Sequence, residues 1–146
     1  MPKPTLALIG HDSKKEDLVQ LVKGHREELT EIELVATRAT GRLIQSRAGL
    51  PVKLMQSGTL GGDQQIGALV ATGEVAAVIF LRDPLMARPH EPDIAAVHRV
   101  CDVHNVPLAT NLATAEAILH FISGQGKAAG AYSAELFHED TAIICQ

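Results

Sequence analysis

Five short runs of aliphatic and β-branched residues alternate along this chain with longer stretches that carry apolar residues at helical spacing. Such runs predict strands, here over residues 5–10, 31–37, 52–56, 76–82 and 107–110. Several of them lack polar residues at alternate positions, which is typical of strands covered by helices on both faces. The alternation of strands with helices favours a parallel sheet. The sequence therefore predicts an α/β fold, a single-domain three-layer sandwich with a five-stranded, mainly parallel sheet.

The stretches between these runs predict five helices. The first, over residues 13–29, carries four apolar residues on one face, and Asp12 or Ser13 suits its N-cap. The other helices are predicted over residues 41–48, 62–72, 92–104 and 113–122. Since no repeat or linker divides the 146 residues, we expect one domain over 1–146. Its glycine-rich end, 124–146, is expected to be a flexible or subunit-contact tail.

The composition excludes several classes of function. A net charge of -4 and an aromatic content of 3% argue against binding of nucleic acid. No apolar run is long enough for a membrane span or a signal peptide. The two cysteines, Cys101 and Cys145, provide no disulfide framework, which favours a reducing compartment. We therefore expect a cytoplasmic protein without a membrane or nucleic-acid partner.

Polar and small residues follow each predicted strand at its carboxyl end, where ligands bind in parallel α/β sheets. They include acids, imidazoles, hydroxyls, a lysine and glycines, at 11–15, 37–41, 57–63, 83–84, 89–93 and 111. Such a set has the chemistry to bind a small anionic metabolite and to move protons on it. Each member also has a structural interpretation: Asp63 and Asp93 suit helix caps, Lys15 a solvated helix face, and Ser57-Gly58 an ordinary turn.

A zinc site is the competing interpretation. His98, Cys101 and His104 lie at i, i+3 and i+6 of one predicted helix, and these residue types ligate zinc. The i to i+6 pair is badly placed for one metal ion, and no second cluster completes a ligand set. A buried Cys101 with solvated histidines is the favoured interpretation. The chain also has no GxGxxG or Walker A motif, so no nucleotide cofactor is expected.

An ordered set of motifs covers roughly residues 6–121. It comprises His11-Asp12-x-x-Lys15, Thr37-x-x-Thr40-Gly41, Ser57-Gly58-x-x-Gly61-Gly62-Asp63-Gln64-Gln65-x-Gly67, Asp83-Pro84-Leu85, Pro89-His90-x-Pro92-Asp93 and residues 109–115. Together these motifs resemble the methylglyoxal synthase family. Each motif alone is weak, whereas the set in this order is highly specific.

This resemblance implies a carbon–oxygen lyase that converts dihydroxyacetone phosphate to methylglyoxal and inorganic phosphate. It implies no metal or organic cofactor, and a homohexamer that phosphate inhibits. By motif match, Asp63 removes the C3 proton, Asp93 is an auxiliary acid or base, and His90 donates a hydrogen bond to the substrate oxygen. The implied substrate-binding residues are His11, Asp12, Lys15, Thr37, Arg38, Ala39, Thr40, Ser57 and Gly58.

The chain departs from the family pattern after its second predicted strand. The family's Thr-Gly-Thr-Thr-Gly reads Thr37-Arg38-Ala39-Thr40-Gly41 here. Arg38 either adds a guanidinium contact to phosphate or displaces the loop, the latter if the family glycine needs a positive φ. We expect substrate binding to be retained with altered affinity. Two other functions stay open: a non-catalytic phosphate or effector-binding module of the same fold, and a structural subunit with a vestigial site.

Overall fold

The computed structural model of the chain describes residues 3–86 and 91–124, without the side chains of 91–93 and 124. Its sheet has five strands in the order β3-β2-β1-β4-β5, and every neighbouring pair is parallel. The strands are β1 (Thr5–Gly10), β2 (Glu33–Ala36), β3 (Lys53–Leu54), β4 (Ala77–Leu81) and β5 (Leu108–Ala109). All five predicted strands are confirmed; the first keeps its predicted bounds and the other four are shorter than predicted.

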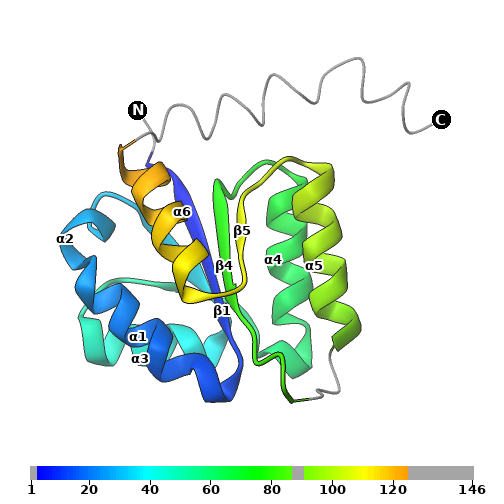
Figure 1. The fold of residues 1–146 in the computed structure, drawn as a ribbon, viewed down its shortest axis with the longest axis horizontal. Coiled ribbons are helices and arrows are strands. Elements are labelled where there is room, and N and C mark those ends of the chain that lie inside the picture. The colour runs from blue at the N-terminus through cyan, green and yellow to red at the C-terminus, as the bar shows by residue number, and fades with distance from the viewer. Residues whose placement is uncertain (1–2, 87–90, 125–146) are drawn as a thin grey trace.

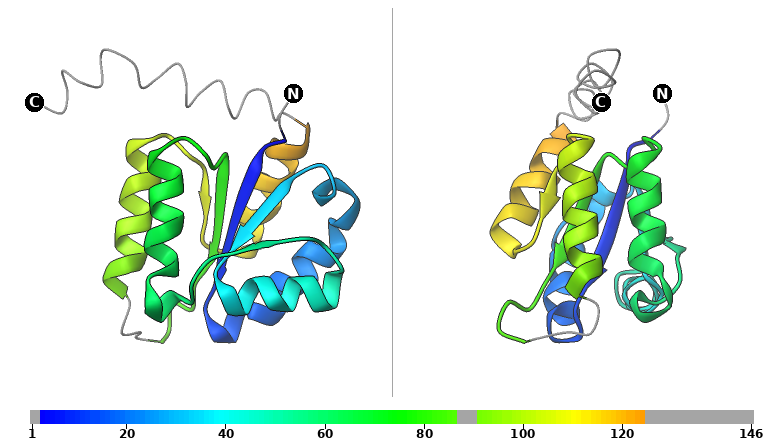
Figure 2. Two further views of the ribbon diagram at one scale, coloured as in Figure 1. Left: turned by 180° about the vertical axis from the view of Figure 1, so that it is seen from behind. Right: turned by 90° about the vertical axis from the view of Figure 1, so that its right-hand side faces the viewer.

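Helices cover both faces of this sheet (Figures 1 and 2). One face carries α1 (Lys15–Gly24), α2 (Arg26–Leu29), α3 (Arg38–Ala48) and α6 (Leu112–Gly124). The other face carries α4 (Gly62–Ala71) and α5 (Glu91–Val103), which lie side by side. Two short 3-10 turns, η1 (Asp12–Lys14) and η2 (Gly58–Leu60), follow β1 and β3. The predicted three-layer α/β sandwich is confirmed.

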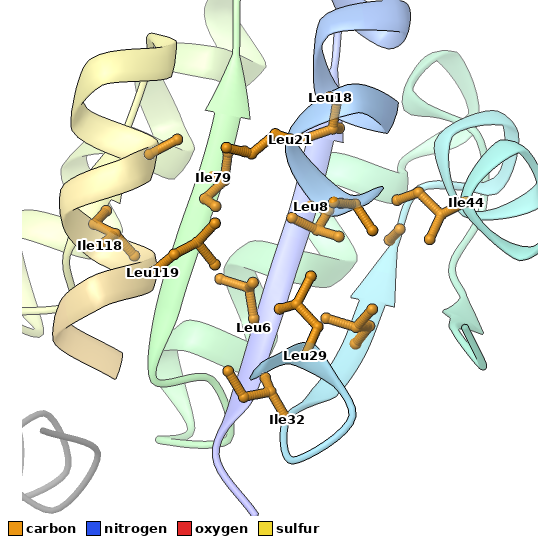
Figure 3. Close-up of a cluster of buried hydrophobic side chains, with 14 of the residues drawn as sticks. Leu6, Leu8, Leu18, Leu21, Leu29, Ile32, Ile44, Ile79, Ile118 and Leu119 are labelled. Carbon is orange, nitrogen blue, oxygen red and sulfur yellow. The ribbon is translucent and has the colours of Figure 1, made fainter. Parts of the chain in front are cut away.

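Side chains along β1 alternate between two apolar cores. Leu6 and Leu8 point into the core shared with α1, α3 and α6, which Figure 3 shows. Ala7 and Ile9 point into the core shared with α4 and α5. Because successive strand residues face opposite sides, a continuous apolar run is what a strand with two buried faces requires. This explains why the runs lack polar alternation.

Helix α3 begins earlier than the sequence predicted. It was expected to begin at Gly41, but Thr37 is its N-cap, Arg38 is its first residue, and the Gly41 N–H donates to the Thr37 carbonyl at 2.8 Å. Gly41 lies inside the helix, at a position where the helix packs closely on the sheet and leaves no room for a side chain. A Cβ at Gly41 would lie 2.3 Å from Leu54 Cδ2. The glycine therefore provides a close approach and does not form a loop.

The helix predicted over 13–29 is interrupted. His25 has φ -115° and ψ 23°, outside the helical region, and separates α1 from α2. The preceding Gly24 is a poor helix former. The predicted N-cap is also wrong: Asp12 and Ser13 lie in η1, and Lys14 occupies the N-cap position of α1 without a side-chain capping bond. None of the helices in the described part of the chain combines the length and apolarity that crossing a bilayer needs.

Candidate active site

A cavity of about 270 Å³ lies at the carboxyl edge of the sheet. The strand order changes direction between β1 and β4, and ligands of open parallel sheets bind at such a switch point. Three strand-to-helix connections line the cavity: the end of β1, the start of α3 after β2, and the segment from η2 to α4 after β3. The lining residues are Ile9, Gly10, His11, Asp12, Lys15, Thr37, Ala39, Ser57, Gly58, Thr59 and Asp63.

Most of the site residues predicted from sequence meet in this cavity. His11, Asp12, Lys15, Thr37, Ala39, Ser57, Gly58 and Asp63 all line it. Arg38 and Thr40 do not. Ile9, Gly10 and Thr59 also line the cavity and were not predicted; each lies within two positions of a predicted residue, His11 or Gly58. His90 lies outside the described residues. Asp93 lies in α5, and its side chain is also outside the description.

Lys15 supplies a positive charge at the cavity. Its Nζ donates to the Gly10 carbonyl at 2.9 Å and to Asp12 Oδ1 at 2.8 Å. The Lys15 side chain is only 18% exposed, whereas that of Asp12 is 87% exposed. A solvated carboxylate is a weak partner for an ammonium group, because water screens the pair. An incoming phosphate can therefore take the place of Asp12 on Lys15.

His11 is a buried residue with a fixed ring. Its Nδ1 accepts a hydrogen bond of 2.9 Å from the Asp83 N–H. The ring packs edge-on against Phe80, with 5.7 Å between ring centroids and an interplanar angle of 89°. The His11 N–H donates to the Leu81 carbonyl at 3.0 Å, which ties the end of β1 to the end of β4. His11 is thus held at the switch point by its ring and its backbone.

Asp63 is buried in the first turn of α4 and is 1% exposed. It is not the helix cap, because the N-cap position belongs to Gly61, which has a φ of +97° that glycine favours. Gly62 brings α4 close to the end of β3: a Cβ there would lie 2.0 Å from the Gln56 carbonyl oxygen. These glycines place the carboxylate of Asp63 in the cavity at a helix N-terminus.

The start of α3 forms another part of the cavity wall. Thr37 and Thr40 are buried, and their Oγ1 atoms lie 3.5 Å apart. Ala39 lines the cavity, and Arg38 is half-buried beside it. Arg38 is the first residue of α3 and is not among the residues with positive φ. The structure therefore removes the expectation that the arginine displaces a strained loop, since its backbone is helical.

The zinc interpretation finds no support in the described residues. Cys101 is fully buried in the core beneath α5, and burial raises the pKa of its thiol to about 12. His98 is exposed on the same helix, with Nε2 3.5 Å from Asp102 Oδ2. Within residues 3–86 and 91–124, no group of three or more potential metal-ligating side chains comes together.

The arrangement joins a buried carboxylate, a buried imidazole, a lysine and two helix N-termini around one cavity. Helix N-termini and lysine bind anions such as phosphate. A carboxylate in a confined site next to such an anion-binding cradle has the chemistry to remove a proton from the bound molecule. The geometry defines a catalytic α/β domain for a small phosphorylated metabolite.

Comparison with known proteins agrees with this class. The family model of the MGS-like domain matches residues 17–110. Methylglyoxal synthase of Carboxydothermus hydrogenoformans is 58% identical over 118 residues, which cover 81% of this chain and 98% of the relative. That of Cupriavidus taiwanensis is 53% identical over 130 residues, covering 89% and 98%. The crystal structure of methylglyoxal synthase from Elizabethkingia anophelis superimposes with a TM-score of 0.78 at 46% identity, covering 83% of this chain and 81% of that one.

The chain therefore belongs to the methylglyoxal synthase family. It is an enzyme, and its activity is that of this family. The resemblance expected from the ordered motifs is confirmed.

Proposed function

We propose that the chain converts dihydroxyacetone phosphate to methylglyoxal and inorganic phosphate, with Asp63 as the base. The observation that carries the proposal is the placement of a 1% exposed carboxylate in a cavity of about 270 Å³ that Lys15 also lines. Similarity to methylglyoxal synthases at more than half identity supports the reaction.

In the proposed reaction, Asp63 takes a proton from C3 of the substrate. The electrons of that C–H bond form an enediolate, whose oxygen needs a hydrogen-bond donor as its charge develops. His90 is the proposed donor and Asp93 an auxiliary acid or base. The C3 hydroxyl then gives its proton to the auxiliary base and becomes the aldehyde carbonyl, the C2–C3 double-bond electrons shift to C1–C2, and the C1–O bond breaks so that phosphate leaves with its electron pair. Proton transfer to C1 of this enol product gives methylglyoxal.

Binding of the phosphate group is assigned to other residues that line the cavity. Lys15 and the N-termini of α3 and η2 are the proposed contacts, through the hydroxyl groups and backbone N–H groups of Thr37, Ser57 and Gly58. Ala39 has no hydroxyl to add, while Thr40 supports Thr37 from the buried side. Arg38 and Asp12 complete the proposed set as flanking charges.

The test is methylglyoxal formation from dihydroxyacetone phosphate by the purified protein. The proposed function predicts product, and a phosphate-dependent rise in Tm from binding of the leaving group. The absence of product, with or without a rise in Tm, would contradict the proposed reaction.

We further propose a cytoplasmic homohexamer that phosphate inhibits. Phosphate inhibition follows if the product competes for the cradle around Lys15. Exposed apolar side chains near the carboxyl edge support assembly, because such groups commonly mark subunit contacts; they are Leu60, Leu85 and Met86, which are 73%, 91% and 53% exposed. Sedimentation of the purified chain measures the oligomer, and initial rates with added phosphate measure the inhibition. The proposed tail contact of 124–146 lies outside the described residues.

A further inference from the structure

The hydrogen bond between the Asp83 N–H and His11 Nδ1 decides where the imidazole carries its proton. A backbone N–H can only donate, so Nδ1 must accept and must be unprotonated. In a neutral ring, the proton then sits on Nε2. An imidazolium would set two N–H groups against each other across 2.9 Å, so this contact selects the neutral form.

The ring has little freedom to escape this arrangement. His11 is 4% exposed, its backbone is tied to Leu81, and Phe80 packs edge-on against the ring. A flip of the imidazole would replace the Nδ1 acceptor by carbon and leave the half-buried Asp83 N–H without this partner. Loss of that partner disfavours the flipped ring.

Asp83 is itself held by two hydrogen bonds to its carboxylate. Ser13 Oγ donates to Oδ2 at 2.7 Å, and the Leu85 N–H donates to Oδ1 at 3.0 Å. Ser13 lies in η1, only two residues after His11 in sequence, while Asp83 is 70 residues away. Two of these hydrogen bonds, from Ser13 to Asp83 and from Asp83 to His11, thus close a ring from His11 through η1 and Asp83 back to the His11 imidazole.

We propose that His11 acts as a neutral donor that presents Nε2–H to an oxygen of the bound substrate, and that Ser13 is a positioning residue that holds the Asp83 backbone against Nδ1. The inference rests on the proposed assignment of His11 to the substrate site, and the cavity lining supports it. No proton is transferred from His11. A neutral N–H donor stabilises a developing oxyanion without being consumed in the step.

The tautomer of His11 can be measured in the free protein, without substrate. In a nitrogen-15 spectrum of the side chains, the His11 ring should show one proton, on Nε2, and an unprotonated Nδ1 at neutral pH. Its signals are identified among those of the seven histidines by their loss in His11→Gln. A proton on Nδ1, or on both nitrogens, would overturn the proposal even if the enzyme is fully active.

Two matched substitutions test the donor. The amide nitrogen of His11→Gln reaches the position of Nε2, whereas His11→Asn mimics only the Nδ1 side of the ring. We expect kcat/KM of His11→Asn to be at least about tenfold below that of His11→Gln, which is the usual effect of losing a hydrogen bond to a charged group. Equal values would remove the donor role. His120→Gln, on an exposed position of α6, is the control with unchanged activity.

Ser13 is tested by removal and rescue of its hydroxyl. Ser13→Ala should lower kcat/KM roughly two- to tenfold, the value of one hydrogen bond, and should add the second tautomer to the His11 spectrum. Ser13→Thr should restore both. A Ser13→Ala protein with wild-type rate and an unchanged spectrum would overturn the positioning role.

Discussion

The backbone of Gly58 lies directly against the carboxylate of Asp63. A Cβ built on Gly58 would be 3.0 Å from Asp63 Oδ1 and 3.8 Å from its Cγ. Gly58 begins η2 after β3, and Asp63 lies in the first turn of α4. The position of the proposed base is therefore set by the absence of a side chain five residues earlier.

Gly58→Ala should impair turnover without unfolding the protein. Gly58 does not have a positive φ, so alanine can adopt its backbone conformation. The added methyl group forces the Asp63 carboxylate to move by a few tenths of an ångström, and we expect kcat to fall roughly tenfold. Gly24→Ala is the control, since a Cβ there meets nothing within 4 Å. Steady-state kinetics with wild-type kcat for Gly58→Ala would show that this contact does not set the geometry of the base.

The pair Arg38→Gly with Ala39→Thr should change KM more than kcat. Ala39 lines the cavity, so the threonine hydroxyl adds a donor on the phosphate side, while the loss of Arg38 removes a nearby charge. Both changes act on binding in the ground state and the transition state alike. We expect KM to change about threefold or more, with kcat within about twofold. An unchanged KM would show that these two positions take no part in substrate binding.

The ion pairs of His25 should make stability depend on pH. Its Nδ1 lies 2.6 Å from Glu28 Oε2, and its Nε2 lies 2.6 Å from Glu116 Oε2 on α6. Burial lowers the pKa of His25, but the two carboxylates raise it by more, so that it lies above 6.5. Only the imidazolium donates from both nitrogens. The stabilisation is therefore complete below the unfolded pKa and is lost as pH rises through the raised folded value.

His25→Gln tests this dependence through Tm. The substitution should lower Tm more at pH about 6 than at pH about 9, because the wild-type protein has lost the doubly bonded form at the higher pH. His120→Gln provides the reference for a histidine exposed on α6. The same loss of Tm at both pH values would mean that the charge of His25 contributes nothing.

Much of the fold and site followed from local sequence signals. The apolar run of β1 predicted its bounds because both of its faces are buried. His11, Lys15 and Asp63 were correctly placed in one cavity, since the carboxyl ends of parallel strands share one edge of a sheet.

The features that the sequence did not predict depend on contacts distant in the chain. The start of α3 was misplaced because Gly41 was taken as a helix boundary, whereas its role is to pack against Leu54. The hydrogen bond from Asp83 to His11 joins residues 72 apart, and no local pattern specifies it. Ser13 was predicted as a helix cap and Asp83 only as part of a family motif, and neither was linked to His11.

Asp63→Asn tests the central claim most directly. Asparagine keeps the shape of the side chain but cannot accept the substrate proton as a base. We expect kcat for methylglyoxal formation to fall by at least about a hundredfold, the usual contribution of a general base. Tm and its rise with added phosphate, measured on the same preparation, should be retained because Lys15 and the helix N-termini are intact. A kcat close to that of the wild-type enzyme would contradict the assignment of Asp63 as the base.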